Sequence, residues 1–264
     1  MYAFDYQRPA SISAAAAAWQ GEARFLAGGQ SLIQAMKLRL SSSERLVDLG
    51  GIADLKGIKV EGGKVVIGAM TTHAAVAASA EVRKAIPALA ELAGGIGDAM
   101  VRNMGTIGGS IANADPAACY PAAVLGLEST VHTNQRAIAG DAFFTGLFET
   151  ALQPGELITA VSFAAPAKAA YMKFRQPASR FALVGVFVSQ SAGGVRVAVT
   201  GARASVFRAK AIEDALAASF TPAAAQAVKL DAAGMNSDQH GSAAYRAAMI
   251  SVMAARAVAA ANAR

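Results

Sequence analysis

The chain has 264 residues, of which 54% are hydrophobic, and a formal net charge of +6 at pH 7. This length exceeds that of a typical single domain, so two or three lobes with cores of their own are expected. The lysines and arginines are scattered along the chain. Binding to a phosphate backbone requires a clustered basic face, so no nucleic-acid partner is expected.

Residues 1–56 are predicted to form a small N-terminal α/β lobe. An Ala-rich helix is expected over residues 11–20, with Ser11 or Ser13 as its N-cap. Short strands are predicted at residues 23–27 and 46–49, and a helix or extended apolar stretch is predicted at residues 32–38. The first strand leads directly into Gly28-Gly29-Gln30-Ser31, the first of two glycine-rich loops.

Residues 57–166 are predicted to form a second lobe. It contains the second glycine-rich loop, Thr106-Ile107-Gly108-Gly109-Ser110. The predicted elements are a β-hairpin around Gly62-Gly63, a helix toward residue 79 capped by Thr71 or Thr72, helices over 81–93 (broken at Pro87) and 121–127, and strands over 129–133 and 157–163.

Residues 167–264 are predicted to form a third, α+β lobe, joined to the second by a linker at residues 164–169. Its predicted elements are strands over 182–189 and 195–200, with a turn at Gly193-Gly194, and helices over 209–218, 222–228 and 242–261.

The two glycine-rich loops share a pattern. Each lies between an apolar run and a stretch of small residues, and each has Ser or Thr beside the glycines. A glycine pair lets the backbone adopt positive φ and approach a ligand closely, and successive free N–H groups in such a turn attract anions. Together the loops predict a cradle that holds a pyrophosphate from both sides. One Gly-Gly pair is more often only a tight turn, so a purely structural role for each loop stays open.

Other patterns that bind nucleotides or catalyse hydrolysis are absent. Gly95-Ile96-Gly97 continues to Met100 where a third Gly would be needed, and no Walker sequence occurs. Ser31 and Thr106 have no histidine that the sequence places beside them, so a hydrolytic triad is not supported. Cys119 is the only cysteine and the three histidines lie far apart. The chain therefore has no intramolecular disulfide, and no iron–sulfur cluster or other metal site of its own is expected.

Two longer motifs carry a resemblance to a known family. Residues 27–40, AGGQSLIQAMKLRL, and residues 102–118, RNMGTIGGSIANADPAA, resemble the two flavin-binding signatures of the medium, FAD-carrying subunits of molybdenum hydroxylases. This family includes carbon monoxide dehydrogenase, xanthine dehydrogenase and bacterial aldehyde or N-heterocycle oxidoreductases. The likeness covers the whole chain, because residues 141–146 and 152–158 resemble the end of the family's FAD domain and residues 241–246 the start of its C-terminal helix.

The resemblance implies an α+β fold and a set of flavin contacts. The fold would be a two-lobed FAD-binding domain of the vanillyl-alcohol-oxidase (PCMH) type, followed by a C-terminal lobe with a small antiparallel sheet and helices. The N–H groups of Gly28 to Ser31 would hold the diphosphate, with Thr106, Gly108 and Gly109 facing it. The implied contact residues are Ala27, Gly28, Gly29, Gln30, Ser31, Leu32, Thr106, Ile107, Gly108, Gly109, Ser110, Asn113, Asp115, Lys173 and Phe181.

Several of these positions have a second explanation or depart from the family. Asn113 and Asp115 would contact the diphosphate or ribose, but a capped turn before a proline explains them equally well. Cys119 stands where many relatives have an Asp that binds the ribose, and a thiol is a weak hydrogen-bond partner. That contact must be lost, replaced by water or taken over by Asp115. Phe181 replaces a Tyr that carbon monoxide dehydrogenase has near the flavin ring, and keeps only its stacking face. Lys173 matches a family lysine near the isoalloxazine, or is a solvated lysine at a strand end.

The function implied by the resemblance is electron transfer. Substrate would be oxidised at a molybdenum-pterin centre in a large partner subunit. Electrons would then pass through two [2Fe-2S] clusters of a small partner to FAD on this chain, and from there to an external acceptor. The expected assembly is a dimer of heterotrimers, a heterohexamer, with no catalytic residue on this chain beyond the flavin. The N-terminus carries no basic region followed by an apolar core, so a cytoplasmic location is expected.

Two alternatives stay open. A free-standing FAD oxidase of the vanillyl-alcohol type shares the two-lobed grip, but carries a capping domain larger than residues 167–264 provide. A flavin-free scaffold subunit would keep the fold without the cofactor, and only Cys119 favours it. Carbon monoxide, aldehydes, purines and other N-heterocycles are all compatible substrates of the complex.

Overall fold

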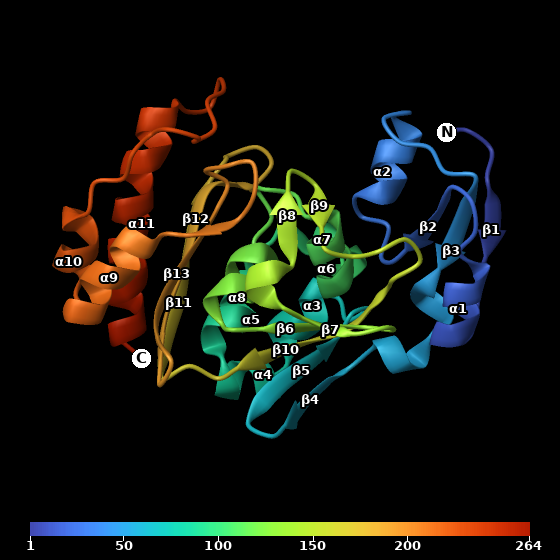
Figure 1. The fold of residues 1–264 in the computed structure, drawn as a ribbon, viewed down its shortest axis with the longest axis horizontal. Coiled ribbons are helices and arrows are strands. Elements are labelled where there is room, and N and C mark those ends of the chain that lie inside the picture. Colours follow the sequence, from blue (N-terminus) through green and yellow to red (C-terminus); the bar gives the residue numbers. More distant parts are fainter.

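The computed structural model describes residues 1–264 as three lobes, each built on its own sheet (Figure 1). The N-terminal lobe has a three-stranded parallel sheet of order β1-β3-β2. Its elements are β1 (Asp5–Gln7), α1 (Ile12–Ala18), β2 (Ala23–Leu26), α2 (Leu32–Lys37) and β3 (Arg45–Asp48). Ser11 caps α1 as predicted, accepting the Ala14 N–H. The sequence pattern does not predict β1, since three residues are too few for an alternation to show.

The middle lobe has a five-stranded antiparallel sheet of order β4-β5-β10-β6-β7. Its strands are β4 (Ile58–Glu61), β5 (Lys64–Gly68), β6 (Thr130–Thr133), β7 (Ala137–Ala139) and β10 (Ile158–Ala164), with a separate short pair, β8 (Phe144–Gly146) and β9 (Glu149–Thr150). The predicted hairpin is β4–β5, whose two turn glycines both have positive φ. The pattern gives no signal for β7, β8 and β9, which have two or three residues each.

Six short helices belong to this lobe. They are α3 (His73–Ala78), α4 (Ala80–Ala85), α5 (Pro87–Gly94), α6 (Ala99–Met104), α7 (Ile107–Asn113) and α8 (Tyr120–Gly126). Thr72 caps α3, as one of the two predicted candidates. The predicted helix over 81–93 is two helices, because Pro87 begins α5, the position in a helix where a missing N–H costs least. The sequence pattern does not predict α6, although Asp98 caps it.

The C-terminal lobe has a four-stranded antiparallel sheet of order β11-β12-β13-β14. Its strands are β11 (Lys168–Arg175), β12 (Ala182–Ser191), β13 (Gly194–Thr200) and β14 (Phe207–Arg208), and its helices are α9 (Lys210–Ala218), α10 (Pro222–Ala227) and α11 (Ala243–Asn262). The predicted linker over residues 164–169 is shorter than expected. β10 ends at Ala164 and β11 begins at Lys168, because residues 168–175 pair along β12.

The C-terminal sheet is covered on both faces, so it forms one body with the middle lobe. Helices α9 and α11 pack on one face, with α10 packed outside them, and α5 and α8 of the middle lobe cover the other face (Figure 1). Phe187 of β12 and Ala198 of β13 accordingly belong to the hydrophobic core of the middle lobe. By length and composition α11 could cross a membrane, but half of its apolar stretch is buried inside the fold.

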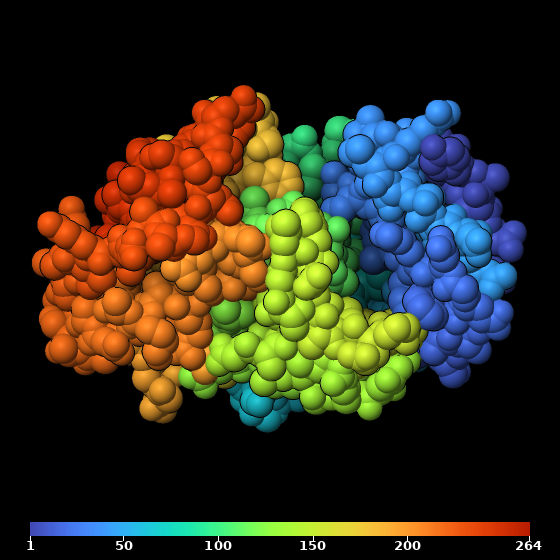
Figure 2. All heavy atoms as spheres, turned by 45° about the horizontal axis from the view of Figure 1, so that its top comes forward, coloured from blue at the N-terminus to red at the C-terminus, as the bar shows by residue number.

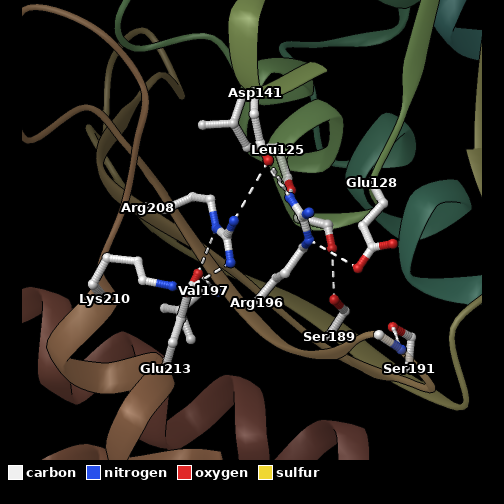
Figure 3. A network of polar contacts seen from close by, with 12 residues as sticks. Leu125, Glu128, Asp141, Ser189, Ser191, Arg196, Val197, Arg208, Lys210 and Glu213 are labelled. Atoms are coloured by element: carbon white, nitrogen blue, oxygen red, sulfur yellow. Dashed lines mark hydrogen bonds and ion pairs between the residues drawn. The ribbon is translucent and has the colours of Figure 1, made fainter. Parts of the chain in front are cut away.

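An ion-pair network holds the same two lobes together on the surface (Figure 3). Arg196 of β13 donates to both carboxylate oxygens of Asp141, each at 2.9 Å, and to Glu128 at 3.0 Å. It also donates to the Leu125 carbonyl at 3.0 Å. Arg208 donates to Glu213 at 2.7 Å and extends the network to α9. The network therefore fixes the C-terminal sheet against α8 and the segment that follows it.

Candidate functional site

A cleft of about 860 Å³ lies between the N-terminal and middle lobes, with one wall supplied by the C-terminal lobe. Figure 2 shows the surface hollowed between the N-terminal lobe, in blue, and a yellow-green segment of the middle lobe. Every predicted contact residue except Ile107 lines this cleft. The Ile107 side chain is instead fully buried in the hydrophobic core. Segments far apart in sequence are thus brought together as the two motifs predict.

The first glycine-rich loop presents a row of free donors. The N–H groups of the five residues from Gly28 to Leu32 find no acceptor within the chain, and the Ser31 hydroxyl makes no capping bond to α2. Gly29 has a φ of +75°, which side chains rarely adopt. A Cβ on Gly28 would lie 1.7 Å from the Met104 carbonyl oxygen, so only glycine fits there. The loop is a preformed anion nest packed tightly against the end of α6.

The second glycine-rich loop is the first turn of helix α7. Thr106 caps this helix, and its hydroxyl accepts the Gly109 N–H at 3.1 Å. The N–H groups of Gly108 and Ser110 donate to the carbonyls of Ala69 and Thr106, each at 2.9 Å. These donors are already used, so the second loop is not the free nest that the paired glycines predict.

The glycines of the second loop serve close packing instead. A Cβ on Gly108 would lie 2.6 Å from the Cβ of Ala69, and one on Gly109 would lie 3.2 Å from the Cβ of Ala27. Ala27 belongs to the N-terminal lobe and Ala69 to the middle lobe. The two glycines therefore let α7 pack closely against Ala69 of its own lobe and Ala27 of the N-terminal lobe. The Thr106 and Ser110 hydroxyls are the polar side-chain groups that this first turn adds to the cleft.

Asp115 forms a capped turn that borders the cleft. Its Oδ1 accepts the Ala117 N–H at 2.8 Å, which is the predicted capped turn. The residue also lines the cleft, as does Asn113. Burial raises the pKa of Asp115 above its ordinary value. One carboxylate oxygen is thus committed to the turn, and the group as a whole is partly desolvated.

Lys173 and Cys119 meet at the wall that the C-terminal lobe supplies. The Lys173 ammonium donates to the Gly95 carbonyl at 2.8 Å and to the Cys119 sulfur at 3.4 Å. Cys119 is 5% exposed and directly precedes helix α8. Lys173 lies within β11, and these two contacts hold its ammonium group. It is therefore not a freely solvated lysine at a strand end. Its positive charge is fixed at the edge of the cleft.

His73 is a buried residue of the cleft that no sequence motif marks. It is 4% exposed and lines the cleft. Its ring packs against Tyr120, with the two ring centroids 5.3 Å apart. Its Nδ1 has no hydrogen-bond partner. Burial, with a smaller contribution from the Arg102 charge, lowers the pKa of His73 to about 4. The sequence carries no signal for this site, since only the fold buries the first residue of α3.

Comparison with known proteins identifies the family. Residues 2–166 match the family described as "FAD binding domain in molybdopterin dehydrogenase". The chain belongs to this family. It is 40% identical to the carbon monoxide dehydrogenase medium chain of Afipia carboxidovorans, over 99% of this chain and 97% of the relative. It is 33% identical to the nicotine 6-hydroxylase medium subunit of Paenarthrobacter nicotinovorans, over 99% of this chain and 98% of the relative.

Solved structures agree with this assignment. The reconstituted CO dehydrogenase from Oligotropha carboxidovorans has a chain that superposes with a TM-score of 0.89 at 36% identity, covering 100% of this chain and 99% of that one. Quinoline 2-oxidoreductase from Pseudomonas putida 86 superposes with a TM-score of 0.87 at 29% identity, covering 98% and 97%. The expected α+β fold is confirmed. The chain is an FAD-binding medium subunit of the molybdenum hydroxylases, and the free-standing oxidase is set aside.

Proposed function

We propose that this medium subunit holds FAD in the cleft and relays electrons within a three-subunit molybdenum hydroxylase. A small partner subunit would deliver electrons from two [2Fe-2S] clusters, and a large partner would oxidise the substrate at a molybdenum-pterin centre. An external acceptor would then take the electrons from the flavin. The observation that carries the proposal is the row of free N–H groups from Gly28 to Leu32 on a cleft of about 860 Å³.

The residues of the cleft fit the cofactor. Backbone N–H groups can neutralise a diphosphate without buried cations, and a cavity of this volume lies in the range usual for cofactor sites. The first loop would hold the diphosphate, and the hydroxyls of Thr106 and Ser110 would face it from α7. When bound, FAD collects electrons one at a time from a one-electron donor and releases them to an acceptor.

Residues of the C-terminal lobe would set the environment of the flavin ring. Lys173 keeps a fixed positive charge at the cleft, because the Gly95 carbonyl and the Cys119 sulfur hold its ammonium group. A nearby positive charge stabilises any negative charge that the ring acquires on reduction. Phe181 is 48% exposed on the connection between β11 and β12 and offers an aromatic face at the same wall.

The single cysteine supports the need for partners. Iron–sulfur clusters are held by several cysteines, and this chain has only Cys119, which is buried. The relatives are named as medium chains or medium subunits, which implies assemblies with larger and smaller chains. We place the assembly in the cytoplasm as a dimer of heterotrimers.

Anaerobic reduction of the assembled complex tests this function. The three co-expressed subunits should bleach their flavin absorbance when the substrate of the large subunit is added, whereas the isolated medium subunit should keep its flavin oxidised. Flavin that stays oxidised in the complex, while the iron–sulfur absorbance is reduced, would contradict the relay.

A further inference from the structure

Trp19, the only tryptophan of the chain, lines the cleft at the end away from the C-terminal lobe. It directly follows helix α1, and as the C-cap of that helix it donates its N–H to the Ala16 carbonyl. In Figure 1, α1 and the C-terminal lobe lie on opposite sides of the middle lobe. Trp19 therefore marks one end of the cleft, and the wall with Lys173 and Phe181 marks the other.

The indole of Trp19 spans two lobes. A Cβ on Gly155 would lie 3.4 Å from the indole Cε3 and 3.7 Å from Cδ2, so the backbone of Gly155 lies beside this ring. Gly155 has a φ of +74°, which side chains rarely adopt. It belongs to the segment between β9 and β10, which extends toward the N-terminal lobe in Figure 1. The ring thus reaches from the N-terminal lobe to the middle lobe at this end of the cleft.

The turn beside the indole is held by the Glu156 carboxylate, which is buried. It accepts from the Arg136 guanidinium at 2.9 and 3.0 Å, from the Thr133 hydroxyl at 2.8 Å and from the Gln153 N–H at 2.8 Å. These hydrogen bonds balance the negative charge within the chain. Glu156 also lines the cleft, so it fixes this wall without offering a free charge to a ligand.

The lining around Trp19 is apolar. Ala18, directly before Trp19, packs against a hydrophobic cluster that contains Leu49 and Leu157, and both leucines line the cleft. Phe25 of β2 packs against the same cluster and also lines the cleft. An apolar lining with aromatic faces favours a planar, uncharged ring, and nucleobases stack on aromatic side chains in this way.

The first glycine-rich loop lies between the two ends of the cleft. In Figure 1, α2, which begins directly after the loop, lies between α1 and the C-terminal lobe. FAD carries its flavin ring on one side of the diphosphate and adenosine on the other. With the diphosphate on this loop and the flavin ring at the wall of the C-terminal lobe, the end at Trp19 is left for the adenine.

We propose that the Trp19 indole binds the adenine ring of FAD, and that this contact makes the cleft select the dinucleotide over FMN. FMN carries the flavin ring and one phosphate but no adenosine, so it gains nothing from Trp19. The inference rests on the proposed function, which places the flavin ring at the opposite end. Trp19 is thus a specificity-determining residue for the cofactor and takes no part in electron transfer.

Fluorescence of the full, flavin-depleted chain tests the proposal, because all of its tryptophan emission comes from Trp19. ADP is the first probe, since it carries adenine and a diphosphate but no flavin that would quench the emission from a distance. Saturable quenching by ADP is expected.

Equilibrium dialysis then compares variants in their affinity for ADP, FAD and FMN. Trp19→Leu, which keeps an apolar contact with Gly155, should weaken ADP and FAD binding by about tenfold and leave FMN binding unchanged. Trp19→Phe keeps an aromatic face and should stay within about threefold of the wild type. Tyr2→Ala is the matched control, because Tyr2 is an exposed aromatic residue of the same lobe that does not line the cleft.

The outcomes separate this inference from the function on which it rests. Equal FAD affinity in the wild type and Trp19→Leu overturns the inference and leaves the flavin cleft standing. An equal loss of FAD and FMN affinity in Trp19→Leu also overturns it, because Trp19 would then act on the fold or on the flavin half. A wild-type chain that binds ADP with quenching of Trp19 but takes up no flavin retains the adenine site and removes the relay.

Discussion

Replacement of Gly28 by alanine should weaken FAD binding without unfolding the chain. A Cβ at this position would lie 1.7 Å from the Met104 carbonyl oxygen and 3.3 Å from the Thr106 side chain. Ordinary contact begins near 3.4 Å, so the first loop must retreat from the middle lobe by about 1.7 Å. Such a shift breaks one or two hydrogen bonds to the diphosphate, each worth about 1.5–3 kcal/mol. We expect the Kd for FAD to rise at least about tenfold.

The assay is fluorescence titration of flavin-depleted protein with FAD, accompanied by circular dichroism to verify folding. Gly94→Ala is the control, since a Cβ there meets only the Ala77 Cβ at 3.7 Å, and it should leave the Kd unchanged. If Gly28→Ala bound FAD as tightly as the wild type, the close approach of the loop to the middle lobe would have no part in binding, and the cradle would be wrongly placed.

Three further perturbations follow from the same structure. Cys119→Asp should tighten FAD binding by about tenfold by restoring an acceptor for the ribose, and an unchanged or weaker affinity in flavin titration would exclude that contact. Burial lowers the pKa of His73 to about 4, so the unfolded chain binds more protons there and the stability of the fold declines as pH falls from 6.5 towards 4. His73→Asn should flatten this dependence in urea unfolding, and an unaltered pH profile would show that the site contributes nothing. Arg196→Ala should cost about 1–3 kcal/mol, because the Leu125 carbonyl and two carboxylates lose their donor. Lys59→Ala is the control, since it removes only an exposed ion pair and should leave the denaturation midpoint nearly unchanged. Equal midpoints for Arg196→Ala and Lys59→Ala would exclude a stabilising role for the ion-pair network.

The sequence predicts the parts of the fold that are marked by local signals. Ser11 caps its helix, Pro87 divides two helices, and the β4–β5 hairpin turns at its glycine pair, since each depends on a few adjacent residues. The sequence does not predict strand β11, because its residues, KAAYMKFR, do not alternate between apolar and polar and its pairing with β12 depends on tertiary structure.

The sequence predicts which segments line the cleft, but it does not predict which of their N–H groups are free. The motifs place both glycine-rich segments on one cleft, but they do not show that Gly108 and Gly109 have their N–H groups bonded within the chain. Which donors stay free depends on where α7 docks, and only the tertiary structure fixes that. His73 lacks a sequence signal for the same reason. Its low pKa arises from burial in the folded chain, and no sequence motif marks it.

The most direct test of the central claim is the visible spectrum of the purified medium subunit, followed by release of the chromophore in acid. The cleft with its free N–H row predicts flavin bands and stoichiometric FAD in the acid extract. A colourless chain, from both the isolated subunit and the assembled complex, would contradict the account and would favour a scaffold subunit that has kept the fold and lost the cofactor.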